Sequence, residues 1–315
     1  MKISVAINTY NSEKTLRACL DSVKDFDEIL VCDMYSEDRT LEIAEEYGAK
    51  IFMHEKTGYV EPARNFVISK AENDWVLVVD SDETITSELR EFLYNFLEDA
   101  QDYSAVKIPR LNYYLGEPLE ILYPDRIIRF IKKEDVIWLP TIHSTPQLER
   151  GRLFVVDEDR RELAIHHAYT SGVSELLNTV NKYTDIELSH KIERDDKLEN
   201  PFFAVWKSLL RMFEVLILKG GYKDGFRGFI VAVVVFGLYK FCIYAKYWEY
   251  KKKSEITSLP AAKKLFPLPF GYSFYYIKSS GEIDYKEFLD KFFVICDFTV
   301  DEKNFFALTK EVTHE

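Results

Sequence analysis

Cysteine is scarce in this sequence, and the four cysteines are far apart: Cys19, Cys32, Cys242 and Cys296. Zinc sites and disulfide frameworks need closely spaced cysteines, so we expect neither. Unpaired thiols are typical of proteins in a reducing compartment. The cysteine pattern therefore favours the cytoplasm.

Two kinds of apolar segment are also missing. Lys2 is followed directly by a predicted strand, which leaves no room for a secretory signal peptide. The longest apolar run, residues 228–239, is shorter than the roughly 20 residues that a spanning helix needs, and Lys240 interrupts it. We therefore expect a protein that can attach to a membrane surface but has no helix across the bilayer.

A glycine-rich loop is absent after the first predicted strand, where Thr9-Tyr10-Asn11-Ser12 stands instead. Nucleotidyltransferases normally carry such a loop at this place, so the sequence disfavours that class. The composition, with 47% apolar and 15% aromatic residues, excludes a disordered protein.

The net charge of −12 is unevenly distributed. Residues 201–264 carry 12 Lys and Arg against 4 Asp and Glu, a net of +8, whereas the rest carries 29 against 49, a net of −20. Anionic lipid and nucleic acid would both attract the basic segment. Its long apolar runs favour the membrane surface, and we expect no nucleic-acid partner.

The segment Trp75–Val79 organises the rest of the chain. Five consecutive apolar residues predict a strand buried on both faces. Asp80, Ser81, Asp82 and Glu83 follow it, and ligands of open α/β sheets bind beyond the carboxyl ends of strands. One turn can direct Asp80 and Asp82 at a hard cation that carries phosphate oxygens. A solvated acidic turn that caps the next helix is the alternative.

Strands and helices alternate before this segment. Further strands are expected at Ile3–Thr9, Glu28–Cys32 and Lys50–Met53, with helices near 15–23, 40–47 and 63–71. This alternation predicts an α/β fold with a mainly parallel sheet. Residues 9–11, Asp33 and residues 80–82 should then meet at one edge of the sheet, which strengthens the metal-site hypothesis.

Several motifs in the chain resemble family 2 glycosyltransferases of the GT-A (Rossmann-like) fold. They lie at residues 4–23, 28–52, 63–83 and 181–187. A closer similarity, to the lipopolysaccharide-core β-glucosyltransferase-like group, is carried by PRLNYYLG (109–116), YPDRIIRF (123–130) and residues 220–246. The resemblance covers about residues 1–250.

The resemblance implies a metal-dependent, inverting hexosyltransferase of the cell envelope. It would move a sugar from a nucleotide-sugar donor, with a UDP-sugar favoured, to a lipid-linked or glycan acceptor. By the same resemblance, the residues that bind the donor are Thr9, Tyr10, Asn11, Asp33, Arg64, Asp80 and Ser81. Asp33 would accept from the base, Asp80 would contact the ribose, and Asp82 would bind Mg²⁺ or Mn²⁺ at the diphosphate.

An inverting transfer also needs a base that takes the proton of the acceptor hydroxyl group. Relatives commonly show a His-Glu pair where this chain has His143-Ser144. Asp125 and His143 are therefore the candidate bases, with Glu83 as a further possibility. The pair His166-His167, after the strand-like residues 163–165, could supply a further metal ligand. One core and one surface residue is the alternative for this pair.

The C-terminal part differs in character. Phe202–Lys219 carries an apolar stripe (Phe203, Trp206, Leu209, Leu210, Phe213, Leu216 and Ile217), and Gly220-Gly221 turns the chain into a second apolar helix. We expect a helical hairpin that lies in the interface of the inner face of the bacterial plasma membrane. A buried helix pair in a soluble dimer is the alternative.

These features divide the chain into three parts. A GT-A domain is expected at 1–190, with a nucleotide-binding half at 1–100 and an acceptor half at 101–190. The basic helical hairpin follows at 191–253, and an extension of unassigned role at 254–315.

Two other functions fit parts of the sequence. Asp80-Ser81-Asp82-Glu83-Thr84 matches the D-x-D-x-T motif of haloacid dehalogenase-like phosphatases, whose first aspartate is a nucleophile. Such chains usually carry that motif on an early strand, whereas here 79 residues precede it. A non-catalytic nucleotide-sugar-binding scaffold is the other alternative, because Ser144 replaces the expected carboxylate.

Overall fold

A computed structural model describes residues 1–56, 61–100, 102–138, 145–170, 172–197 and 199–257. Residues 1–244 form one compact unit, and a second unit begins at Ala245. His143 and nearly all of the C-terminal extension lie outside the described residues. The domain boundaries near 190 and 253 stay predictions.

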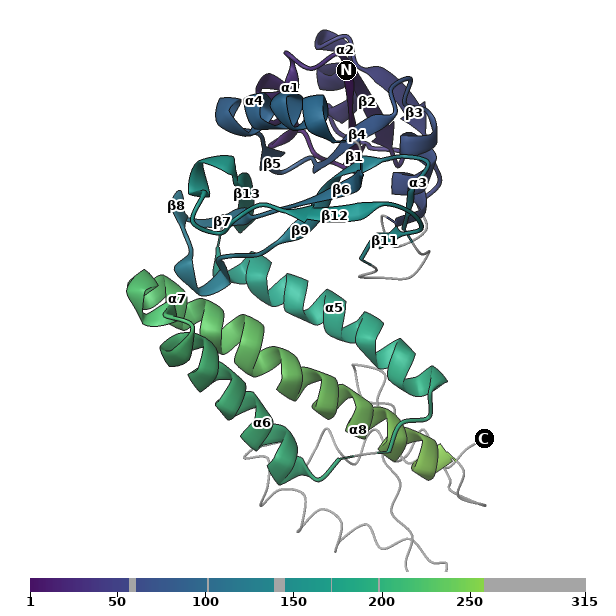
Figure 1. Cartoon of the computed structure of the whole chain (residues 1–315). Coiled ribbons are helices and arrows are strands. Elements are labelled where there is room, and N and C mark those ends of the chain that lie inside the picture. The colour runs from purple at the N-terminus through teal and green to yellow at the C-terminus, as the bar shows by residue number, and fades with distance from the viewer. Residues whose placement is uncertain (57–60, 101, 139–144, 171, 198, 258–315) are drawn as a thin grey trace, which may run out of the picture. The chain divides into compact units, whose positions relative to one another are not determined.

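A seven-stranded sheet forms the centre of the first unit (Figure 1). Its strands, in spatial order, are β12 (Arg152–Val155), β6 (Tyr103–Ile108), β9 (Ile127–Lys132), β4 (Trp75–Asp80), β1 (Ile3–Thr9), β2 (Glu28–Asp33) and β3 (Lys50–Met53). Strands β4, β1, β2 and β3 are parallel, and only β9 runs antiparallel to its two neighbours. The predicted α/β class with a mainly parallel sheet is confirmed.

Helices cover both faces of this sheet. One face packs against α1 (Leu16–Val23), α2 (Thr40–Glu46) and α4 (Ser87–Phe96), and the other against α3 (Glu61–Ser69). Every residue of Trp75–Val79 is buried, because this strand lies inside the sheet with helices on both sides. The apolar run in the sequence therefore identified the central strand correctly.

A second sheet of four short strands lies beside the carboxyl end of β4. Its spatial order is β5 (Glu83–Thr84), β13 (Ile165–Thr170), β7 (Arg110–Tyr114) and β8 (Glu117–Pro118). In the register of this sheet, His167 is paired with both Glu83 and Asn112. A separate hairpin joins β10 (Val136–Ile137) to β11 (Gln147–Leu148).

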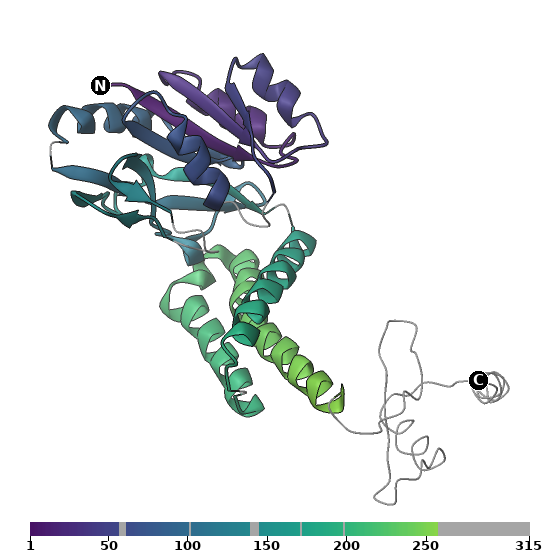
Figure 2. The ribbon, with the colours of Figure 1, turned by 90° about the vertical axis from the view of Figure 1, so that its right-hand side faces the viewer.

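Residues 173–257 are almost entirely helical (Figure 2). The α-helices are α5 (Val173–Glu193), α6 (Pro201–Phe213), α7 (Gly225–Val231) and α8 (Tyr239–Thr257). A π-helix, Glu214–Leu218, continues α6, and another, Ala232–Leu238, joins α7 to α8. Gly220 has a φ of +78° at the turn between the two arms, so the predicted turn is present.

The helical hairpin is joined to the rest of the first unit by polar bonds, and a close backbone contact lies inside the hairpin itself. Both carboxylate oxygens of Asp224 accept from main-chain N–H groups, those of Glu120 at 2.7 Å and Ile121 at 2.8 Å. Arg227 donates to the Tyr114 carbonyl at 3.1 Å. A Cβ added to Gly228 would lie 2.0 Å from the carbonyl oxygen of Gly221. The hairpin therefore has a defined attachment point.

The apolar stripe predicted on α6 is exposed rather than packed. Phe203, Trp206 and Phe213 are each more than half exposed, whereas the buried positions of α6 are Ala204 and Ser208. The helix uses its small residues to pack inside the unit. Its large apolar side chains form a surface that nothing in the described residues covers.

One helical stretch, Gly221–Ser254, is long and apolar enough to cross a membrane by length and composition alone. Its most apolar part has a mean hydropathy of 2.0 and is 28% buried. Lys240 ends the apolar run in the sequence, but the helix continues beyond that residue. Because core helices of soluble proteins also satisfy this criterion, the expected absence of a spanning helix stays a prediction.

Candidate functional site at the carboxyl ends of the central strands

The three predicted strand ends meet at one edge of the sheet. Thr9 is paired with Asp33 across β1 and β2, and Asn8 with Asp80 across β1 and β4. The hydroxyl group of Thr9 donates to Asp33 Oδ2 at 2.8 Å. The convergence expected from parallel strands is confirmed.

Asp33 organises the loop that follows β1 at this edge. It is fully buried and accepts from both the main-chain N–H and the hydroxyl group of Ser36, at 2.7 and 2.6 Å. Ser36 in turn accepts from the N–H of Asn11 at 2.8 Å, and Asn11 has a φ of +48°. These bonds fix the loop after β1. The predicted contact of Asp33 with a base stays a prediction, because its carboxylate is engaged by the protein.

Tyr10 is the exposed aromatic residue of this loop. The residue is 38% exposed, and the ammonium group of Lys56 lies over one face of the ring, 3.4 Å from its centre. That face is covered, so a planar base could stack only on the opposite face. The geometry is compatible with the predicted nucleotide contact of Tyr10.

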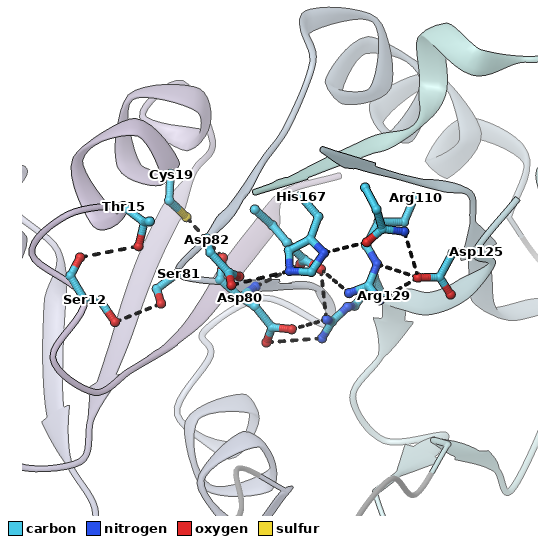
Figure 3. A network of polar contacts seen from close by, with 12 residues as sticks. Ser12, Thr15, Cys19, Asp80, Ser81, Asp82, Arg110, Asp125, Arg129 and His167 are labelled. Atoms are coloured by element: carbon cyan, nitrogen blue, oxygen red, sulfur yellow. Dashed lines mark hydrogen bonds and ion pairs between the residues drawn. The ribbon is translucent and has the colours of Figure 1, made fainter. Parts of the chain in front are cut away.

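Asp80 is held by two arginines. Arg64 donates to Oδ1 at 2.6 Å, and Arg129 donates to Oδ2 (Figure 3). Burial raises the pKa of the Asp80 carboxyl group, but the charges and hydrogen bonds of Arg129 and Arg64 lower the pKa by more, so it lies well below its usual value. A carboxylate held in this way is not a free nucleophile, which argues against the phosphatase alternative.

Glu83 extends this ion-pair network into the core. Its side chain is fully buried, and Oε1 accepts from Arg129 at 3.1 Å and from Arg110 at 2.9 Å. Oε2 accepts from the N–H of Asp80 at 3.0 Å. Burial lowers the pKa of Arg129, but the carboxylates of Asp80 and Glu83 raise it by more. Arg129 therefore stays charged. The carboxylate of Glu83 is buried and engaged by these donors, so it is not placed to act as a base on a substrate.

Asp125, one of the two predicted bases, lies at the far end of the same network. Its Oδ2 accepts two bonds from Arg110, at 2.9 and 2.6 Å, and one from the side-chain amide of Asn112 at 3.2 Å. The side chain is 35% exposed. Within the described chain, Oδ1 accepts no hydrogen bond from the protein. The other predicted base, His143, lies outside the described residues.

Asp82 is the acidic residue of the turn that remains accessible, with a side chain 40% exposed. Its Oδ2 lies 3.4 Å from Nε2 of His167 (Figure 3). The neighbouring Ser81 shares a hydrogen bond of 2.9 Å with Ser12. No group of three His, Cys, Asp or Glu side chains that could hold a metal occurs in the part of the chain that the structure describes. Any cation here would need further ligands from substrate or water.

Sequence reasoning missed the arginines and the amide of this site. Arg110, Asn112 and Arg129 all lie within motifs that carried the resemblance, but none was assigned a role. One signal was available: Arg129 interrupts the apolar strand Ile127–Ile131, where a charge is costly unless it is paired. That pattern identifies a buried ion pair but does not name its partners.

Comparisons with known proteins agree with this geometry. The model of the family described as Glycosyl transferase family 2 matches residues 4–156. An uncharacterized glycosyltransferase of Rickettsia typhi is 29% identical over 267 residues, which cover 80% of this chain and 89% of that one. The poly(ribitol-phosphate) beta-glucosyltransferase of Bacillus spizizenii is 36% identical over 125 residues, 36% of this chain and 20% of that one.

A solved structure, that of TarS from Staphylococcus aureus, aligns with a TM-score of 0.42 and 19% identity, over 74% of this chain and 55% of that one. The family match includes the three strand ends, the Asp80–Glu83 turn and the strands that carry Arg110 and Arg129. The mixed sheet flanked by helices is the arrangement that the GT-A resemblance implied. Residues 4–156 belong to glycosyl transferase family 2, and the chain is a glycosyltransferase.

Proposed function

We propose that this glycosyltransferase is metal-dependent and inverting, and that it moves a sugar from a UDP-sugar to a lipid-linked or cell-envelope glycan. The observation that carries the proposal is the pair of Asp82 and His167. Their side chains approach to 3.4 Å at the accessible end of β4. They lie next to the fixed loop of Tyr10, through the bond between Ser81 and Ser12.

On the donor side, Tyr10 would stack on the base, while Thr9, Asn11 and Asp33 hold the loop that presents it. The two arginines that bind Asp80 would bring positive charge close to the diphosphate. Asp80 itself would reach the ribose only if a bound donor drew one of these arginines away. The donor and the carboxylate would then share Arg64, whose side chain is 12% exposed.

The donor set of Asp82 and His167 fits Mg²⁺ or Mn²⁺. A carboxylate oxygen suits both cations and an imidazole suits Mn²⁺. Two protein ligands leave the remaining positions for diphosphate oxygens and water. When bound, the cation would stabilise the negative charge that develops on the leaving diphosphate. The protein's part is to hold these two side chains at one point.

Asp125 is the described residue proposed as the base, through the Oδ1 that accepts no bond from the protein in the described residues. Arg110 would keep this oxygen oriented by its two bonds to Oδ2. His143 remains the alternative. Replacing Asp125 with Asn, or His143 with Gln, should lower turnover by roughly 10²-fold while sparing donor affinity. If neither replacement lowers turnover, the base is elsewhere.

The metal proposal is tested by binding of UDP to the full-length protein, measured as a thermal shift with and without Mn²⁺. A ligand at 100 times its Kd stabilises the folded state by about 2.7 kcal/mol. Asp82→Ala should lose the part of this shift that depends on Mn²⁺ and keep the melting temperature of the free protein. Asp159→Ala, at an exposed turn, is the matched control. Full activity in EDTA, or an unchanged Mn²⁺-dependent shift in Asp82→Ala, would refute the metal's role.

The exposed face of α6 supports a second part of the proposal, peripheral attachment to the inner face of the bacterial plasma membrane. Phe203, Trp206 and Phe213 offer apolar area of the kind that enters a bilayer interface. Lys207 and Lys223 would meet anionic headgroups, together with Lys251–Lys253. The two arginines of this segment are engaged within the protein, because Arg227 binds Tyr114 and Glu117 and Arg211 forms an ion pair with Glu214.

Liposome sedimentation tests this attachment. Each basic residue near an anionic surface contributes about 1 kcal/mol, so replacing Lys251–Lys253 with Glu should release the protein from anionic vesicles. Binding of the wild type should weaken with salt. Replacing Lys2, Lys24 and Lys70 with Glu makes the same change of charge on the catalytic unit and should have a smaller effect. A wild type that ignores anionic vesicles at low salt would refute membrane attachment.

A further inference from the structure

His167 is held between a neutral amide and the carboxylate of the proposed metal site. Its Nδ1 lies 2.6 Å from Oδ1 of Asn112, and its Nε2 lies 3.4 Å from Oδ2 of Asp82. The strand register explains this placement, because β13 pairs His167 directly with Asn112 of β7. Tyr169 packs edge-on against the imidazole ring. The ring is therefore fixed in position, and what remains to be settled is which nitrogen carries the proton.

The direction of the Asn112 amide answers this. Asp125 Oδ2 accepts two bonds from the guanidinium of Arg110, which can only donate. The same carboxylate oxygen can only accept, so the group of Asn112 at 3.2 Å from it must be the NH₂ group. The carbonyl oxygen of Asn112 then faces His167 Nδ1. Because Asn112 is 2% exposed, this amide has no solvent-facing alternative.

We propose that Asp125 and Asn112 are positioning residues that set the tautomer of His167. The Asn112 carbonyl accepts the proton of Nδ1–H, so the neutral imidazole presents the lone pair of Nε2 beside Asp82. That is the form in which a histidine binds a divalent cation. The inference rests on the proposed metal dependence. It gives Asp125 a role through Oδ2 that is separate from any proton transfer through Oδ1.

The neighbouring histidine supplies an internal comparison. His166 projects from the opposite face of β13, where its Nδ1 lies 3.4 Å from the hydroxyl group of Tyr113. It has no contact with the chain of Asp125, Asn112 and His167 in the described residues. His166→Gln is therefore the matched control for changes in that chain.

The first experiment observes the tautomer directly. Long-range ¹H–¹⁵N correlation spectra of full-length protein labelled at histidine, without metal, distinguish a protonated ring nitrogen from an unprotonated one. His167→Gln identifies the signals. The proposal expects Nδ1 protonated and Nε2 unprotonated in His167 of the wild type. A wild-type His167 protonated at Nε2 would overturn it.

The second experiment measures Mn²⁺ binding in the presence of UDP, from the electron paramagnetic resonance signal of free Mn²⁺. Loss of a residue that orients a metal ligand typically weakens binding 10- to 100-fold. Asn112→Leu, which removes the acceptor, should show such a loss and should leave the affinity for UDP without metal unchanged. His166→Gln should match the wild type. A change of less than threefold in Asn112→Leu would refute the positioning role.

Asp125→Leu covers the case in which Asn112→Leu fails to fold. Without an acceptor at 125, the direction of the Asn112 amide is no longer fixed, and a mixture of His167 tautomers should appear in the spectra. A single unchanged tautomer in that variant would count against the role of Asp125. A wild type that binds no Mn²⁺ with UDP present would instead refute the metal dependence, and with it the purpose of the tautomer.

Discussion

Replacing Arg129 with Met tests the ion-pair network that underlies the site. The Arg129 side chain is 6% exposed, and it donates to the fully buried Glu83 and to Asp80. Removing one partner of a buried ion pair costs about 3–5 kcal/mol, because a charge stays behind without compensation. Asp80 keeps Arg64, and Glu83 keeps Arg110, so we expect the lower end, about 3 kcal/mol.

For a domain of 150–250 residues, 1 kcal/mol shifts the melting temperature by about 2–4 °C. Arg129→Met should therefore lower it by about 6–12 °C in thermal unfolding followed by circular dichroism. Arg39→Met is the matched control, because Arg39 forms an exposed ion pair with Glu42, and such pairs contribute about 0–1 kcal/mol. Adding Glu83→Gln to Arg129→Met should recover part of the loss, since it removes the uncompensated charge.

The pH dependence of the stability difference between the wild type and Arg129→Met gives a second measurement. The pKa of Asp80 is lowered in the folded state, against about 3.9 in an unfolded chain. Its contribution to stability is therefore complete above about pH 5 and is lost as the pH falls below the unfolded value. The difference in melting temperature between the wild type and Arg129→Met should be constant from pH 6 to 8 and should become smaller below pH 4. An Arg129→Met variant as stable as Arg39→Met at pH 7 would refute the reasoning.

Three further predictions concern the helices and the loop that carries Tyr10. Gly228→Ala should lower the melting temperature, because the new Cβ would meet a main-chain carbonyl at 2.0 Å. Gly237→Ala, whose new Cβ would have its nearest contact at 3.5 Å, should leave the melting temperature unchanged or raise it, since Ala is the better helix former by about 1 kcal/mol. Asp224→Ala should lower the free energy of unfolding, measured by chemical denaturation, by about 1–3 kcal/mol, because two main-chain N–H groups lose their acceptor. A change near zero would show that water replaces the carboxylate. Tyr10→Ala should weaken UDP binding in titration calorimetry by about 1–3 kcal/mol if the ring stacks on the base. An unchanged affinity for UDP would contradict that stacking.

The central strands and the edge where they end were predictable because their signals are local. A run such as Trp75–Val79 has to be buried on both faces, and parallel strands bring Thr9, Asp33 and Asp80 together whatever the rest of the chain does. The position of the turn residues at this edge of the sheet could therefore be predicted from the sequence.

The partners of those residues could not be predicted, because they come from pairings distant in sequence. Arg129 reaches Asp80 because β9 inserts antiparallel beside β4, which sets Phe130 opposite Leu77. Nothing within β9 specifies that neighbour. Asp125 was assigned from the resemblance as a base, but its three bonds to Arg110 and Asn112 depend on a fold of residues 110–125 that the motif alone does not describe.

Helix α6 shows a different limit of prediction from sequence, which concerns the face of a helix that is buried. The apolar stripe predicted for this helix is present, yet the structure buries the opposite side, at Ala204 and Ser208. Periodicity identifies two faces but does not say which one packs when the polar face consists of small residues. The choice follows from close approach to the neighbouring helix, which only small side chains allow.

The register of β13 makes chain length critical at one short segment. The N–H of Ala168 donates to the Asp82 carbonyl at 2.9 Å, so the strand is tied to the turn one residue beyond the imidazole. Because side chains alternate along a strand, a shift of one residue in this register would turn His166 and His167 each to the opposite face of the sheet. The exposed turn at residues 157–160 can absorb a change of length, and residues 165–168 cannot. Insertions that preserve activity in this region are therefore confined to one side of Ile165.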